Sequence, residues 1–103
     1  MNNYILNVKQ EVYDDIENIR NFIITVGSKE LALKYTQNLL SEIEDLTYLA
    51  DTMQVSQWKT AKLYHPEARR LITKNRKWNI IYHIEDEFVV VDKIIASSRM
   101  FLK

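Results

Sequence analysis

The sequence contains no cysteine, one glycine and one proline among its 103 residues. Without cysteine the chain forms no disulfide, uses no thiolate nucleophile and holds no cysteine-ligated metal. A single glycine excludes a glycine-rich nucleotide-binding loop, which needs several glycines. No apolar run approaches the roughly 18 residues of a membrane span, and the first residues lack the charged and apolar regions of a signal peptide. The sequence therefore predicts a cytoplasmic protein without a membrane partner.

The length fits a single domain over residues 1–103, and 47% hydrophobic with 27% charged residues is typical of a globular chain. The formal net charge is zero, but the charge is unevenly distributed. Residues 59–77 hold seven basic residues against Glu67 alone. A basic patch on a neutral protein indicates a docking surface for an anion or an acidic partner.

The first half of the chain shows helical periodicity after a short strand at residues 4–9. Val12, Ile16, Ile19 and Ile23 recur at steps of three and four, which predicts one face of a helix ending at Gly27. Ser28 is a good N-cap for a second helix. The apolar stripe of that helix runs from residue 31 to residue 50, so we expect an antiparallel helical hairpin.

The second half changes to a period of two. Residues 68–74, 78–84 and 88–96 read as strands, separated by turns at 75–77 and 85–87. The strand at 88–96 is apolar on both faces, which favours a central position. We therefore predict an α+β two-layer fold of order β-α-α-β-β-β, in which a mostly antiparallel sheet of about four strands packs on the helical hairpin.

This order of elements resembles the RelE/ParE superfamily of toxins from type II toxin–antitoxin pairs. The resemblance rests on Ala68-Arg69-Arg70-Leu71-Ile72, Trp78-Asn79-Ile80-Ile81-Tyr82-His83-Ile84, Phe88-Val89-Val90-Val91 and the tail Ser98-Arg99-Met100. RelE-like members are metal-independent ribonucleases that cut mRNA at the ribosome, whereas ParE-like members poison DNA gyrase. Both kinds are neutralised by an antitoxin, in some cases within a heterotetramer.

Two departures favour the ParE-like branch. Ribonuclease members place an arginine before the apolar-apolar-Tyr run, where this sequence has Asn79. They also end in groups that transfer protons, whereas this chain ends its last strand near Arg99-Met100-Phe101. The resemblance therefore implies a gyrase inhibitor that causes growth arrest and belongs to a plasmid-stabilisation type of system. Alternatives are an mRNA endoribonuclease and a non-toxic module that binds only the antitoxin.

The candidate site residues follow from these readings. The residues that would contact the target or a phosphate are Arg69, Arg70, Lys74, Arg76, Lys77 and Arg99. In the ribonuclease alternative, the catalytic candidates are Glu67, Arg70 and His83. Strand alternation places Arg69 and Arg70 on opposite faces, so one of the two faces the open side of the sheet.

Exposed apolar residues of the hairpin are candidates for antitoxin contact, namely Phe22, Ile24 and Leu40. The two histidines, His65 and His83, lie far apart in sequence with no carboxylates expected to converge on them, so they make no zinc motif. We therefore expect no metal and no cofactor.

Overall fold

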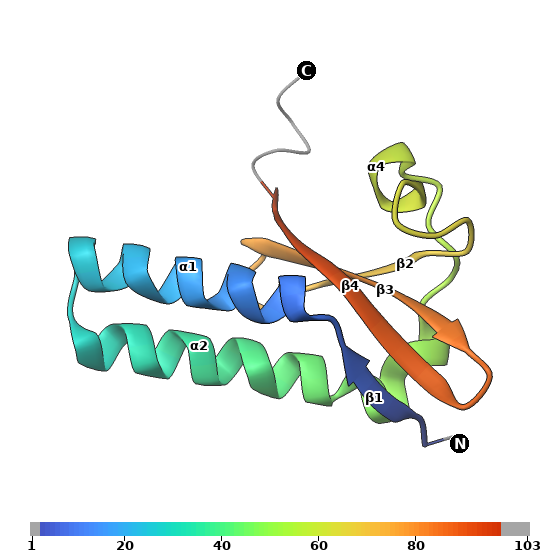
Figure 1. The fold of residues 1–103 in the computed structure, drawn as a ribbon, viewed down its shortest axis with the longest axis horizontal. Coiled ribbons are helices and arrows are strands. Elements are labelled where there is room, and N and C mark those ends of the chain that lie inside the picture. Colours follow the sequence, from blue (N-terminus) through green and yellow to red (C-terminus); the bar gives the residue numbers. More distant parts are fainter. Residues whose placement is uncertain (1–2, 98–103) are drawn as a thin grey trace.

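The computed structural model describes residues 3–97 and has two layers, a helical hairpin and a four-stranded sheet (Figure 1). Strand β1 (Ile5–Val8) leads into helices α1 (Gln10–Val26) and α2 (Lys29–Glu44). Short helices α3 (Leu46–Leu49), η1 (Ala50–Thr52) and α4 (Lys59–Lys62) follow, then β2 (Arg69–Ile72), β3 (Trp78–Glu85) and β4 (Phe88–Ala96). The predicted α+β order is confirmed.

The sheet has the strand order β1-β4-β3-β2, so β4 is central as predicted. Strands β2, β3 and β4 are antiparallel neighbours, while β1 pairs parallel to β4. The register between β3 and β4 shifts between Ile81 and Tyr82, because Ile81 pairs with Lys93 and Tyr82 with Val91. Asp92 is the extra residue of this β-bulge, a feature that redirects side chains.

The helical hairpin forms where local signals predicted it. The Ser28 side chain accepts a hydrogen bond from Leu31 N and caps α2. Gly27 N–H donates to Ile23 O, and a Cβ at residue 27 would lie 3.1 Å from that oxygen and from a Leu31 methyl. The tight connection therefore favours glycine, because a side chain at this position would crowd these two atoms.

The main core lies between the hairpin and the sheet. It joins the predicted stripe of α1 to Leu39, Ile43, Leu46 and Ala50 and to the inward residues of the sheet. Tyr82 is fully buried there and its hydroxyl donates to Ala50 O at 2.7 Å. Burial raises the pKa of Tyr82 above its ordinary value.

The second helix differs from the prediction in two ways. It ends at Glu44, and the chain continues through the separate short helices α3 and η1 rather than as one helix to residue 50. Leu31 belongs to the same apolar stripe, yet it is 53% exposed. Figure 1 shows the reason, since the closed end of the hairpin extends beyond the sheet.

The opposite face of the sheet is covered by the segment that carries α4. Ala61, Ala68, Ile81 and Ile95 form a second, smaller core there, with Trp58 and Tyr64 packed against it. An isolated bridge pairs Val55 with Arg69 and attaches this segment to the edge of β2. The sheet is therefore covered in part on both faces.

Candidate functional site

The turn between β2 and β3 displays three cations, Lys74, Arg76 and Lys77, which we call the basic turn. All three side chains are exposed. The Glu42 carboxylate accepts from Lys74 N at 2.9 Å, and the Asn75 side chain accepts from Lys77 N at 2.9 Å. Arg76 adopts a positive φ of 63°. These contacts hold the backbone of the turn while its charges face solvent.

The paired arginines separate as strand alternation predicted. The Arg69 guanidinium donates to Met53 O and is half-buried on the helix side. Arg70 lies on the other side, with its guanidinium carbon 5.5 Å from the centre of the Trp58 ring. Arg69 therefore anchors the segment after η1. We no longer count it among the residues expected to contact the target. Arg99 lies outside the described residues.

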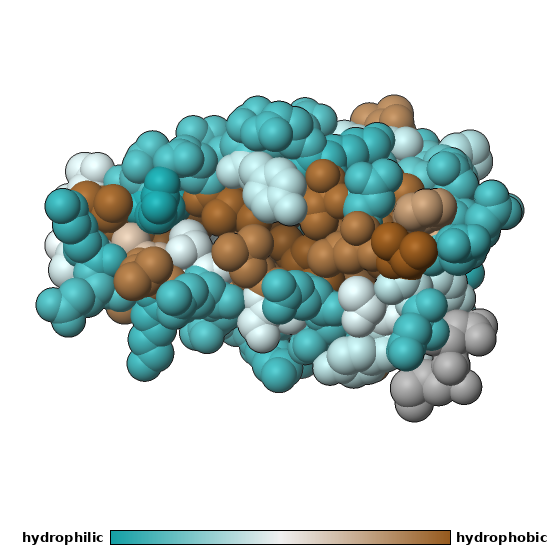
Figure 2. Space-filling model, turned by 60° about the horizontal axis from the view of Figure 1, so that its bottom comes forward, coloured by the Kyte–Doolittle hydropathy of each residue, from teal (hydrophilic) through white to brown (hydrophobic). Residues whose placement is uncertain are grey.

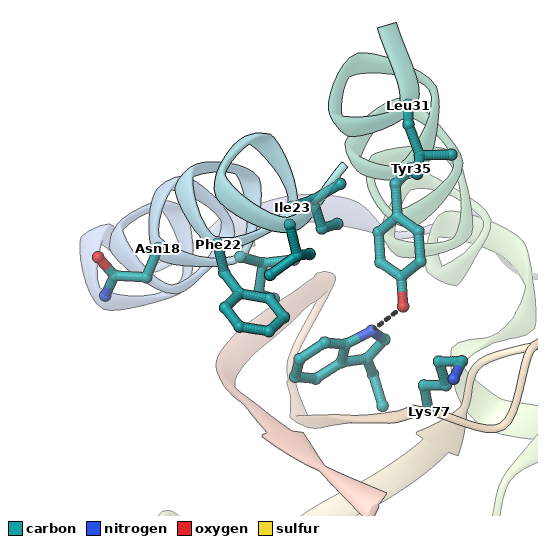
Figure 3. Close-up of a pocket in the computed structure, with 9 residues that line it drawn as sticks. Asn18, Phe22, Ile23, Leu31, Tyr35 and Lys77 are labelled. Atoms are coloured by element: carbon teal, nitrogen blue, oxygen red, sulfur yellow. Dashed lines mark hydrogen bonds between the residues drawn. The ribbon is translucent and has the colours of Figure 1, made fainter. Parts of the chain in front are cut away.

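An apolar groove opens where the hairpin extends past the sheet (Figure 3). Its volume is about 460 Å³. Tyr35 and Trp78 both line it and are joined by a 2.6 Å hydrogen bond from the indole N–H to the tyrosine hydroxyl. The residues that line it are Asn18, Ile19, Phe22, Ile23, Val26, Leu31, Tyr35, Lys77 and Trp78. Lys77 links this groove to the basic turn.

The three candidates for antitoxin contact have different environments. Phe22 is 65% exposed and points into the groove from α1, as Figure 3 shows. Ile24 is also exposed but does not line the groove. Leu40 is half-buried against the main core rather than exposed, because α2 turns it toward the sheet.

Hydrophobic side chains also reach the surface beyond the groove. In Figure 2 they form a band from the closed end of the hairpin toward the β1 end, with hydrophilic residues on both sides. Leu33, which does not line the groove, is more than half exposed, as are Val26 and Leu31 in the groove itself. A contiguous apolar surface with a polar rim is typical of a protein interaction site.

A cluster of charged and imidazole groups lies on the α4 side of the sheet. The buried His83 ring places Nδ1 2.7 Å from Asp92 Oδ2, and Lys9 Nζ lies 2.7 Å from the other oxygen of this carboxylate. The Lys9 contact is an ion pair without the alignment of a hydrogen bond. His65 stacks on His83 with ring centres 3.8 Å apart and planes 5° from parallel.

Glu85 completes this cluster from the same strand as His83. Its Oε2 lies 3.7 Å from His83 Nε2, and one ligand atom each from His65, His83 and Glu85 falls within 4.8 Å of the others. The prediction of no metal assumed that no carboxylate would converge on the histidines. That assumption was wrong. Glu85 lies beside His83 on β3, and the fold brings His65, 18 positions before His83 in the sequence, to the same place.

The candidates for ribonuclease chemistry occupy separate environments. His83 is covered by His65 and paired with Asp92, and Arg70 lies over Trp58. Glu67 is exposed, and its backbone N–H donates to His65 Nδ1. Asn79 is fully buried, and its amide donates to Ile95 O. Met100 and Phe101 lie outside the described residues.

Sequence reasoning also missed a charged contact between the sheet and α1. Lys93 Nζ lies 3.0 Å from Asp15 Oδ1 and 3.3 Å from Glu11 Oε2. Burial lowers the pKa of Lys93, but hydrogen bonds and attraction from these two carboxylates outweigh it and leave the pKa above its ordinary value. The four-residue spacing of Glu11 and Asp15 on one helix face was the available signal.

Among residues 3–97, no helix has the length and apolar character needed to cross a lipid bilayer. No protein-family model matches the sequence, and no curated protein matches it. A search of solved structures finds a chain described as "Chromosomal ParDE TA system from P. aeruginosa", with a TM-score of 0.77 and 16% sequence identity. The match covers 90% of this chain and 95% of the other. The chain therefore has the fold found in a ParDE system, as the resemblance to the RelE/ParE superfamily predicts.

Proposed function

We propose that the chain is the toxin of a type II toxin–antitoxin pair, that it acts by binding DNA gyrase, and that a cognate antitoxin neutralises it. The main support is the fold, which is shared over 90% of the chain with a solved ParDE structure. The ordered motifs of the second half of the sequence point to the same superfamily.

Binding is favoured over RNA cleavage by the chemistry of the sheet. Asn79 occupies the position where the ribonuclease members carry an arginine, and it is buried and hydrogen bonded to Ile95 O. An amide carries no charge to stabilise a developing phosphorane, unlike a guanidinium. His83 is packed beneath His65 rather than open to a scissile bond.

The basic turn is the surface that we assign to the target. Its three cations project from a backbone fixed by Glu42 and Asn75, so a partner with an acidic surface meets a preordered site. Preordered charges increase association rates and fix the orientation of the complex. Arg70, on the same side of β2 as Ile72, extends this surface toward Trp58.

The apolar groove is the surface that we assign to the antitoxin. Phe22, Val26 and Leu31 are more than half exposed there, and burying them offers a partner the hydrophobic free energy of binding. An amphipathic segment with one acidic position could also pair with Lys77 at the end of the groove. A heterotetramer of two toxins and two antitoxins is one assembly compatible with this mode.

Expression of the untagged chain in bacterial cells tests the proposal. We expect growth arrest, and we expect Lys74→Glu/Lys77→Glu to relieve it because two of the three charges of the basic turn are reversed. Lys29→Glu/Lys34→Glu is the matched control, since it reverses two exposed lysines of α2 away from the basic turn. Arrest accompanied by cleavage of translated mRNA would favour the ribonuclease, and absence of arrest would favour a module that binds only the antitoxin.

A further inference from the structure

The side chains around His83 have the arrangement of a metal site, in which three residues offer ligand atoms and a buried carboxylate orients one of them. Strand alternation places His83 and Glu85 on the same face of β3. The β-bulge brings Asp92 onto that face, and the loop after α4 brings His65 over the His83 ring. We propose that His65, His83 and Glu85 bind a divalent transition metal ion of the zinc class.

Asp92 fixes the tautomer that such a site needs. A carboxylate only accepts hydrogen bonds, so the 2.7 Å contact places the proton of neutral His83 on Nδ1. The lone pair of His83 is then on Nε2, on the side of Glu85. A histidine that donates one ring N–H to a buried carboxylate and presents the other nitrogen is the usual support of a metal-ligating imidazole. Lys9 Nζ pairs with the other oxygen of the same carboxylate at 2.7 Å.

The spacing between Nε2 and Glu85 suits a shared ion. The two atoms are 3.7 Å apart, which is too long for a hydrogen bond. Two ligands that each lie about 2.1 Å from a tetrahedral ion are about 3.4 Å apart. A shift of a few tenths of an ångström therefore brings Glu85, whose side chain is 66% exposed, into position.

His65 must move further than Glu85. In stacked rings the nitrogen lone pairs point in parallel directions, so a common ion requires the His65 ring to tilt away from His83. His65 is partly exposed in the loop before β2, which leaves room for this tilt. Binding through Nε2 also moves its proton to Nδ1 and gives up the hydrogen bond from Glu67 N–H. A water molecule completes the tetrahedral set.

The ion would join two parts of the fold that are otherwise held by a small core. His65 belongs to the α4 segment, while His83 and Glu85 belong to β3. A metal that bridges them fixes the segment that carries Trp58, on which Arg70 lies. Metal binding would therefore hold Trp58 and Arg70 in place. The proposal does not depend on whether Arg70 and the basic turn bind gyrase.

Calorimetric titration of the tag-free full chain with ZnCl₂, after removal of metals by a chelator, tests the site. We expect one Zn²⁺ per chain and a rise in Tm of about 10 °C when free Zn²⁺ exceeds Kd a hundredfold. His65→Phe keeps a stacked ring without a ligand atom, and Glu85→Gln removes the exposed carboxylate. Each should weaken binding by at least about tenfold, because each removes one of three protein ligands.

Glu87→Gln is the matched control, since Glu87 is an exposed acid of the β3–β4 turn, two positions after Glu85, and its loss should leave the affinity unchanged. Asp92→Asn should reduce the affinity about tenfold through His83. Absence of binding to the wild-type chain would overturn the site. Affinity that stays undiminished in His65→Phe or in Glu85→Gln would also overturn it, because the ion would then be held elsewhere.

Discussion

The two faces of the sheet bury different kinds of side chain. The centre of the face that meets α1 and α2 is apolar, with Ile80, Tyr82, Val89 and Val91 fully buried. The α4 face has a core of two alanines and two isoleucines, and beside it lie the buried His83 and Asp92. Apolar packing accounts for the first face. Burying a carboxylate and an imidazole costs free energy unless they are paired. The α4 face therefore depends on the specific contacts of His83 and Asp92, which belong to the proposed metal site.

Substitution of Ile80 and Ile81 allows a direct comparison of the two faces. The two residues are adjacent and fully buried, and Ile80 packs in the main core while Ile81 packs in the smaller one. Ile80→Ala should reduce the free energy of unfolding by about 4 kcal/mol, since its neighbours in the large core cannot close the cavity. Ile81→Ala should reduce it by about 2 kcal/mol, because the α4 segment can settle onto the smaller side chain. Urea denaturation followed by circular dichroism measures both. Equal losses would mean that the two cores are equally rigid.

Asp92 tests the polar part of the α4 face. Asp92→Asn should cost about 2 kcal/mol, because Lys9 loses its buried partner while the amide oxygen still accepts from His83. Asp86→Asn is the control, since Asp86 is exposed and has a positive φ of 56°, which asparagine tolerates. The control should change stability by less than about 0.5 kcal/mol. A loss below that limit in Asp92→Asn would show that the buried charge is dispensable.

Lys93 offers a charged contact on the helix side, and a weaker effect is expected there. Lys93→Met should cost no more than about 1 kcal/mol at neutral pH, because the pair with Asp15 and Glu11 is partly solvated. The raised pKa of Lys93 means that its contribution is complete below the ordinary value of 10.5 and is lost as the pH rises through the folded value. As the pH rises above 10.5, the denaturation midpoint should therefore fall less in Lys93→Met than in wild type. If the midpoints of wild type and Lys93→Met fell in parallel with pH, Lys93 would not contribute to the pH dependence of stability.

The apolar groove should contribute least to folding. Phe22→Ser should change the free energy of unfolding by less than about 0.5 kcal/mol, since the ring is 65% exposed. Ile23→Ala, at the next position of α1, should cost about 3 kcal/mol because Ile23 is buried. Thermal unfolding of the two variants separates the roles. A large loss in Phe22→Ser would make the groove part of the core rather than a binding surface.

The hairpin and the sheet could be predicted because their signals are local. The apolar repeat from Val12 to Ile23, the Gly27-Ser28 connection and the alternation at residues 78–84 each lie within one element. The exposure of Leu31 could not be predicted, because it depends on how far the hairpin extends past the sheet.

The least predictable features are those that join distant segments. The stack of His65 on His83 depends on how the chain folds back after α4, and the Asp92 contact depends on a one-residue bulge. Strand alternation separated Arg69 from Arg70 correctly. It could not show that Arg69 would be held by Met53 O, because nothing in the sequence indicates the path of residues 51–66.

The supercoiling activity of purified gyrase in the presence of the purified chain tests the central claim most directly. We expect inhibition with trapped double-strand breaks at micromolar protein, and Lys74→Glu/Lys77→Glu should lose this effect while Lys29→Glu/Lys34→Glu retains it. Unimpaired supercoiling at the same concentration, with a wild-type chain shown to be folded by circular dichroism, would contradict gyrase as the target.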